Sequence, residues 1–213
     1  MSGYRFTVLD VVAEPYAVAP QLTARLRIDA GEGRAVHAIV LRCQVRIEPR
    51  LRRYEPAEQE RLRGQFGEPD RWADTVRPFP WMQCSATVPG FTGRTDLDLP
   101  MPCTYDLDVV GSRYLHALGS GSVPLSFLFS GTVFTRGTTG FAVEQIPWSC
   151  EARHRMPVTV WRDMIASYYP NSGWLRAGSD VLARLTGYRE RHGLTSWDET
   201  FQKLLAAAEG PAS

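Results

Sequence analysis

The stretch Ile39-Val-Leu-Arg-Cys-Gln-Val-Arg-Ile47 decides the fold of this chain. Every second residue of it is apolar, whereas Arg42, Gln44 and Arg46 occupy intervening positions. Because the side chains of a strand alternate between two faces, this spacing predicts a strand with one buried and one solvated face. The same two-residue rhythm continues to about Arg155. We therefore expect an antiparallel β-sheet or sandwich that is exposed on one side.

Several other segments show the same alternation. Leu22–Ile28 alternates like the opening stretch, and the turn Gly31-Glu-Gly33 separates the two, so we expect them to pair as an antiparallel hairpin. In the last strand of the series the phase changes at Pro147, which cannot donate to a ladder, and a bulge or an edge position is expected there. The remaining expected strands are Phe6–Val12, Met82–Val88, Thr104–Val109, Leu125–Thr135 and Phe141–Ala152, the last with Ile146, Trp148 and Cys150 on one apolar side.

The rhythm is interrupted once and then ends. Residues 49–78 are rich in Arg, Glu and Pro and contain a short helical pattern at 56–66, which indicates an insertion between strands because a strand resumes directly afterwards. After residue 157 the apolar spacing becomes helical over 158–168 and 179–192, and the capping box Ser196-Trp-Asp-Glu199 begins a third helix. We expect a mainly β (α+β) fold: an antiparallel sheet or sandwich body over 1–157, and C-terminal helices over 158–213 that pack on it.

Composition narrows the class of protein. The 213 residues are 44% hydrophobic and carry a net charge of +1, so no global field attracts nucleic acid or an anionic membrane. All but one of the 24 basic residues are Arg, a bias that either anion or interface contacts or a GC-rich genome would produce. The first residues lack a basic segment followed by an apolar one, and the uncharged stretch Tyr114–Thr135 indicates a turn plus a buried strand. We expect a cytoplasmic protein without membrane insertion.

The metal-ligand residue types form no recognisable motif. Cys43, Cys84, Cys103 and Cys150 are widely spaced, contain no C-x-x-C pair and are expected to be reduced, with all but Cys103 in the apolar phase of a strand. His37 and His154 also fall in apolar phases, which predicts core or edge histidines. The alternative, a mixed site with Cys43 and Cys150, requires that their strands be adjacent. No metal site and no cofactor are therefore predicted.

Two Asp-x-Asp pairs form the strongest polar constellation. Asp96 with Asp98, and Asp106 with Asp108, each place two carboxylates on one face of a strand. Such a set holds a divalent cation, acts as an acid–base couple or forms a solvated outer face, and the leucines between the aspartates favour the outer face. The question of a cation stays open at this point.

No signature of an enzyme is present. Gly119-Ser-Gly-Ser122 is not the G-x-S-x-G nucleophile elbow, and the chain has no P-loop and no G-x-G-x-x-G after a strand. We therefore predict no catalytic residue and a protein that is not an enzyme.

Two groups of residues are candidates for contact with a partner protein. Leu128 and Phe134 lie on the second face of the strand over 125–135, which needs a cover supplied either by the tail or by a partner. Tyr168, Tyr169 and Trp174 surround a Pro-Asn-Ser-Gly loop, where aromatic rings either anchor a partner, stack on a sugar or pin the helices onto the sheet. A homo-oligomer is compatible with both groups.

Three strings carry a family resemblance: Val123-Pro-Leu-Ser-Phe-Leu-Phe-Ser-Gly-Thr-Val-Phe134, Ile146-Pro-Trp-Ser-Cys150 and Tyr168-Tyr-Pro-Asn-Ser-Gly-Trp-Leu175. Over nearly its whole length the chain resembles an uncharacterised actinobacterial family of unknown function associated with gene clusters for nickel-iron uptake hydrogenases. The resemblance implies a non-enzymatic accessory or scaffolding protein whose partner is a hydrogenase subunit or maturation factor. It supplies no catalytic residue.

Two alternatives belong to other classes. The order of strands followed by C-terminal helices is similar in outline to an export chaperone that holds unfolded clients. The Asp pairs or the loop from Tyr168 to Trp174 would instead suit a small-molecule or sugar-binding module.

Overall fold

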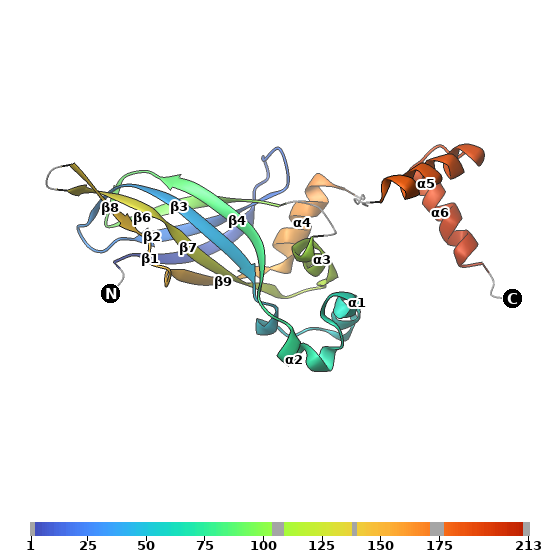
Figure 1. Ribbon diagram of the computed structural model, residues 1–213, viewed down its shortest axis with the longest axis horizontal. Helices are drawn as coiled ribbons and strands as arrows, with labels where there is room; N and C mark the ends of the chain where they lie inside the picture. Colours follow the sequence, from blue (N-terminus) through green and yellow to red (C-terminus); the bar gives the residue numbers. More distant parts are fainter. Residues whose placement is uncertain (1–2, 104–108, 138–139, 171–176, 211–213) are drawn as a thin grey trace. The chain divides into compact units, whose positions relative to one another are not determined.

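The computed structural model describes residues 3–103, 109–137, 140–170 and 177–210 (Figure 1). The chain forms two compact units, one ending at Trp174 and the other beginning at Leu175. Asp106, Asp108 and Trp174, and the strand expected from Thr104, lie outside the described residues, apart from Val109.

The first unit contains two antiparallel sheets, which confirms the mixed α+β class with antiparallel sheets and C-terminal helices. One sheet has the order β1-β2-β6, made of β1 (Arg5–Ala13), β2 (Gln21–Asp29) and β6 (Arg94–Pro102). The other has the order β4-β3-β7-β8, made of β4 (Phe79–Val88), β3 (Ala35–Ile47), β7 (Ser122–Gly137) and β8 (Gly140–Gln145), with β5 (Phe91–Thr92) paired to β3 and β9 (Glu151–Pro157) paired to β7.

The prediction that β2 and β3 pair as an antiparallel hairpin is wrong. β2 pairs with β1 and β6, whereas β3 pairs with β4, β5 and β7, so the two strands belong to different sheets. Gly31 and Gly33 adopt positive φ angles of 93° and 68° in the connection between them. Alternation identified the buried face of each strand correctly, but it carries no information about which neighbour completes the ladder.

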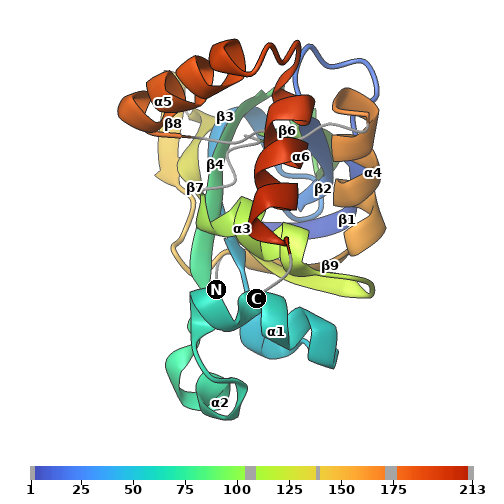
Figure 2. The same cartoon turned by 90° about the vertical axis from the view of Figure 1, so that its right-hand side faces the viewer.

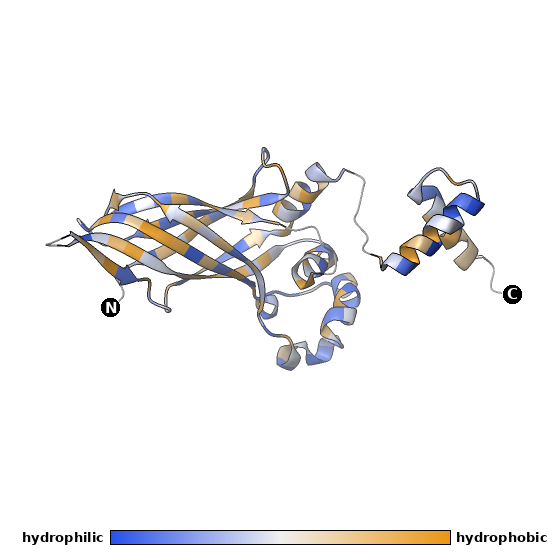
Figure 3. Ribbon diagram, turned by 45° about the horizontal axis from the view of Figure 1, so that its top comes forward, coloured by the Kyte–Doolittle hydropathy of each residue, from blue (hydrophilic) through white to orange (hydrophobic). Residues whose placement is uncertain are grey.

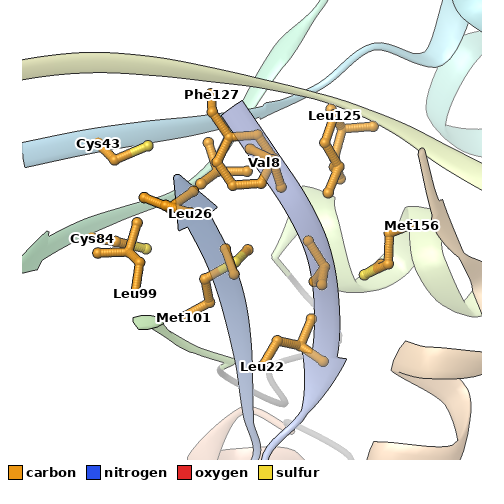
Figure 4. Packing of buried hydrophobic residues seen from close by; sticks show 14 of the residues in the cluster. Val8, Leu22, Leu26, Cys43, Cys84, Leu99, Met101, Leu125, Phe127 and Met156 are labelled. Atoms are coloured by element: carbon orange, nitrogen blue, oxygen red, sulfur yellow. The ribbon is translucent and has the colours of Figure 1, made fainter. Parts of the chain in front are cut away.

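The core lies between the inner faces of the two sheets. Leu26 and Phe127 are fully buried, and the ring of Phe6 from one sheet stacks on that of Phe129 from the other at 4.3 Å between centroids. Figure 4 shows side chains of both sheets, among them Val8, Leu26 and Phe127, gathered in this layer. Hydropathy alternates along the strands accordingly (Figure 3). Burial of such side chains contributes about 1.5–3 kcal/mol each and is the main stabilisation of the sandwich.

β8 and β9 behave as one interrupted edge strand. Both pair with β7, and the residues from Ile146 to Cys150, including Pro147, form the break between them. Gly131 of β7 lies opposite Leu41 with φ 138°, and a Cβ there would meet the Val40 carbonyl oxygen at 2.1 Å, so only glycine fits. The expectation for Trp148 is wrong: this side chain is 93% exposed because the break turns it away from the core.

Helices of the first unit gather at one end of the sandwich (Figures 1 and 2). They are α1 (Pro56–Phe66) and α2 (Trp72–Thr75) in the insertion, α3 (Val110–Ala117) and α4 (Val158–Tyr168). α3 was not expected, because an eight-residue helix offers too few turns for a periodic pattern and its first residues lack a side-chain cap. It buries Tyr114 and Leu115 beside α1.

The second unit consists of α5 (Ser179–Arg191) and α6 (Trp197–Ala208). Ser196 and Glu199 form the expected capping box, and the Arg189 guanidinium lies 4.6 Å above the Trp197 ring. The helices expected over 158–213 therefore belong to both units. α4 is part of the first unit, where it contacts β1, β2 and β9, whereas α5 and α6 form the second. Within the described ranges, no helix is both long and apolar enough to span a bilayer.

Candidate functional site

An apolar patch is exposed on the outer face of the sheet at β8. Ala38, Phe134 and Val143 are directly opposite one another across β3, β7 and β8, and therefore share that face. Phe141 and Val143 are 66% and 58% exposed, and Val40 is 45% exposed. We call these five residues the outer patch.

The outer patch lies at a sheet edge. Among the described strands, β8 pairs only with β7, so its other edge presents main-chain N–H and C=O groups without a ladder partner. The His37 ring lies 4.6 Å from the Phe141 ring and borders the patch, as does Gln145, whose side-chain amide donates to Thr132 at 3.2 Å. Exposed apolar side chains on an edge strand are typical of a surface that receives another protein segment.

The structure separates Leu128 from Phe134. Leu128 is half-buried on the same outer face, between Gln44 of β3 and Glu151 of β9. Six residues of strand, about 20 Å, separate it from Phe134. Of the two predicted residues, only Phe134 belongs to the outer patch.

Tyr168 and Tyr169 pack against the core of the first unit. The Tyr168 hydroxyl donates one shared hydrogen bond to two carbonyl oxygens, those of Ala17, at 2.7 Å, and Glu14, at 3.2 Å. This bond holds the end of α4 against the connection between β1 and β2. The third predicted member of this group, Trp174, lies outside the described residues.

The described aspartates occupy a solvated sheet face. Asp96 forms a bidentate ion pair with Arg27 on the neighbouring strand at 2.8 Å, and Asp98 lies opposite Arg25. Hydrogen bonds from Arg27 hold the pKa of Asp96 below its usual range. In the described ranges, no group of three or more His, Cys, Asp or Glu side chains has the arrangement of a metal site.

All four cysteine thiols are buried, and none of them forms a disulfide in the structure. Cys43 faces Cys84 across β3 and β4, and burial raises the pKa of Cys84 to about 11. His37 is exposed, whereas His154 is half-buried and burial lowers its pKa. Cys43 of β3 and Cys150, in the break between β8 and β9, lie on opposite sides of Phe129 of β7, so the mixed site with the two histidines does not form.

A buried ion pair at the helical end of the sandwich was missed by the sequence patterns. The Arg52 guanidinium contacts both carboxylate oxygens of Glu58, at 2.8 and 2.9 Å, and the two side chains are 7% and 3% exposed. Arg52 also donates to the carbonyl oxygens of Ser120 and Ser122, and Gly119 donates its N–H to Glu58 at 2.6 Å. The pair therefore fastens the insertion to the glycine-rich turn before β7. The two residues of the pair are six positions apart, but the hydrogen bonds that join them to Gly119, Ser120 and Ser122 span 61 to 70 positions, and no local spacing reveals contacts at that separation.

Beside this ion pair lies a cavity of about 540 Å³, which we call the arginine cavity. Four arginines and two glutamates line it together with the turn from Ser120 to Ser122; these are Arg50, Arg52, Arg53, Arg155, Glu55 and Glu58. Its polar lining sets it apart from the outer patch, which offers apolar contact.

Comparison with known proteins identifies the family of this chain. No curated protein matches the chain. A model of a family of unknown function, DUF6084, matches residues 1–213, the whole of the chain. The chain therefore belongs to the DUF6084 family.

Proposed function

We propose that this chain is a non-enzymatic accessory protein that binds a partner protein through the outer patch. The observation that carries the proposal is the exposure of Phe141 and Val143 on the edge strand β8, where Val143 lies beside Phe134 of β7. Covering a Phe or Val side chain contributes about 1.5–3 kcal/mol when burial is complete. Two such side chains suffice to anchor a partner segment, and the unpaired β8 edge adds main-chain hydrogen bonds.

The partner we propose is a subunit or maturation factor of a nickel-iron hydrogenase. This choice is supported by the resemblance of the strings around β7 and the break at Ile146–Cys150 to a family associated with such gene clusters. The apolar side chains and the unpaired edge of β8 support a partner that contributes an apolar segment in extended conformation and continues the sheet beyond β8.

A holding chaperone is the second candidate. The outer patch and the 93% exposed Trp148 supply apolar surface for unfolded clients. A holding chaperone would capture many unrelated clients, whereas an accessory protein captures one assembly.

The test is affinity capture of the tagged full chain from its native host while the hydrogenase is expressed. We expect hydrogenase subunits or maturation factors to be enriched over capture from a host strain that lacks the hydrogenase genes. Absence of these proteins under expressing conditions contradicts the proposed partner. Recovery of many unrelated proteins in both strains favours the chaperone.

A further inference from the structure

We propose that the arginine cavity binds a small ligand that carries phosphate or carboxylate groups. This site is separate from the outer patch, since its lining comes from η1 (Pro49–Leu51), α1 and the residues between them, the turn before β7, and β9.

The charges around the cavity do not balance. Glu58 is neutralised by Arg52, and the Glu55 side chain accepts the backbone N–H of Glu58 in the capping box of α1. Within the described residues, the guanidinium groups of Arg50 and Arg53 have no hydrogen-bond acceptor and no carboxylate partner. Like charges that converge on one cavity repel each other, and an anion bound between them removes that repulsion.

Arg155 adds a third cation. It donates to the Leu51 carbonyl oxygen at 2.9 Å and has no carboxylate partner among the described residues. A guanidinium presents five N–H donors in a planar fork, so one bond to a carbonyl leaves donors for a ligand. This bond also fixes β9 against η1 and so sets the width of the cavity.

The walls are held in place before any ligand arrives. The buried Arg52–Glu58 pair fixes the insertion to the carbonyl oxygens of Ser120 and Ser122, and the Arg52 guanidinium lies 5.1 Å from the centre of the Tyr54 ring. A preorganised site loses less entropy on binding than a mobile one.

The geometry of arginine selects the ligand class. Planar forks match the paired oxygens of phosphate and carboxylate groups, and such charge-assisted bonds are about twice as strong as neutral ones. A volume of about 540 Å³ is typical of small-molecule sites and exceeds what one inorganic phosphate fills. We therefore expect at least two oxyanion groups on the ligand.

The experiment is calorimetric titration of the full chain with inorganic pyrophosphate and, separately, with citrate, at about 0.15 M salt. The variants are Arg50→Gln and Arg53→Gln, both at exposed positions, so the fold does not depend on them. The matched control is Arg113→Gln, which removes the same charge from an exposed position of α3 outside the cavity. Circular dichroism verifies that each variant is folded.

We expect one or both probes to bind the unaltered chain with a sub-millimolar dissociation constant. At least one cavity variant should bind about tenfold more weakly, the effect of losing one charge-assisted hydrogen bond, while Arg113→Gln stays within about twofold. Pyrophosphate binding alone identifies a phosphate ligand, and citrate binding alone a carboxylate ligand. The proposal is overturned if neither probe binds, if both cavity variants bind normally, or if Arg113→Gln weakens binding equally.

Discussion

Replacing Glu58 by Gln removes the carboxylate that neutralises Arg52. The two side chains are only 3% and 7% exposed, so the substitution leaves a buried cation without its counter-charge. Loss of one partner from a buried pair costs about 3–5 kcal/mol. Arg52 keeps its hydrogen bonds to the carbonyl oxygens of Ser120 and Ser122, which places the expected loss near the lower limit, about 3 kcal/mol.

Urea unfolding at pH 7 measures this loss as a lower midpoint with an unchanged m value. Glu60→Gln on the same helix is the matched control, because Glu60 is 69% exposed and pairs with Arg63 at 3.2 Å. An exposed pair of this kind contributes about 0.5 kcal/mol or less. If Glu58→Gln destabilises the chain no more than Glu60→Gln, the buried pair does not fasten the insertion as described.

The difference in the free energy of unfolding between the unaltered chain and Glu58→Gln should depend on pH. Burial by itself raises the pKa of the Glu58 carboxyl, but the N–H groups of Gly119 and Glu55 and the Arg52 guanidinium outweigh burial and lower the pKa. A group whose pKa is lowered by folding stabilises the fold fully above its unfolded pKa, about 4.3 for Glu. The advantage over Glu58→Gln should therefore be constant near pH 7 and shrink as the pH falls below about 4. An advantage that grows on acidification would contradict the lowered pKa.

Three further outcomes follow from the fold. Phe127→Ala, at a fully buried position, should lower the free energy of unfolding by about 3–5 kcal/mol, whereas Leu128→Ala on the outer face should cost about 1 kcal/mol; equal costs would contradict the assigned faces. A thiol reagent should label none of the four cysteines in the folded protein and all four after unfolding. Every thiol is buried, and burial raises the pKa of Cys103 to about 12. Rapid labelling of the folded protein would refute this burial. Ser196→Ala should destabilise α6 by about 1 kcal/mol and reduce helical circular dichroism, unless the hydrogen bond from the Glu199 N–H to the Ser196 hydroxyl is absent in solution.

Local sequence patterns predicted the positions of the strands and helices better than they predicted which strands pair with each other. Alternation located β2 and β3 and their inner faces, yet it placed them in one hairpin, because the period of a strand does not encode its neighbour. Ser196 and Glu199 marked the start of α6 because a capping box is a local signal. The short helix α3 escaped notice because its eight residues carry no such signal.

In the candidate sites, too, local patterns revealed single residues but not their surroundings in the fold. Phe134 was identified as an apolar residue on the second face of its strand, but nothing local distinguishes a covered strand face from an exposed one, so the exposure of Phe141 and Val143 was not predicted. The arginine cavity depends on contacts such as the one between Arg52 and the turn at Ser120, and sequence spacing carries no information on contacts at this separation.

Substitution of Val143 by Asp tests most directly the claim that the outer patch binds the partner protein. The amount of hydrogenase subunit recovered with the tagged full chain is compared between the unaltered chain, Val143→Asp and Val18→Asp. Val18 is fully exposed outside the outer patch, so its variant controls for the added charge. A carboxylate in the covered interface should reduce recovery at least about tenfold for Val143→Asp, while Val18→Asp retains the partner. Equal recovery with all three chains would contradict binding through the outer patch.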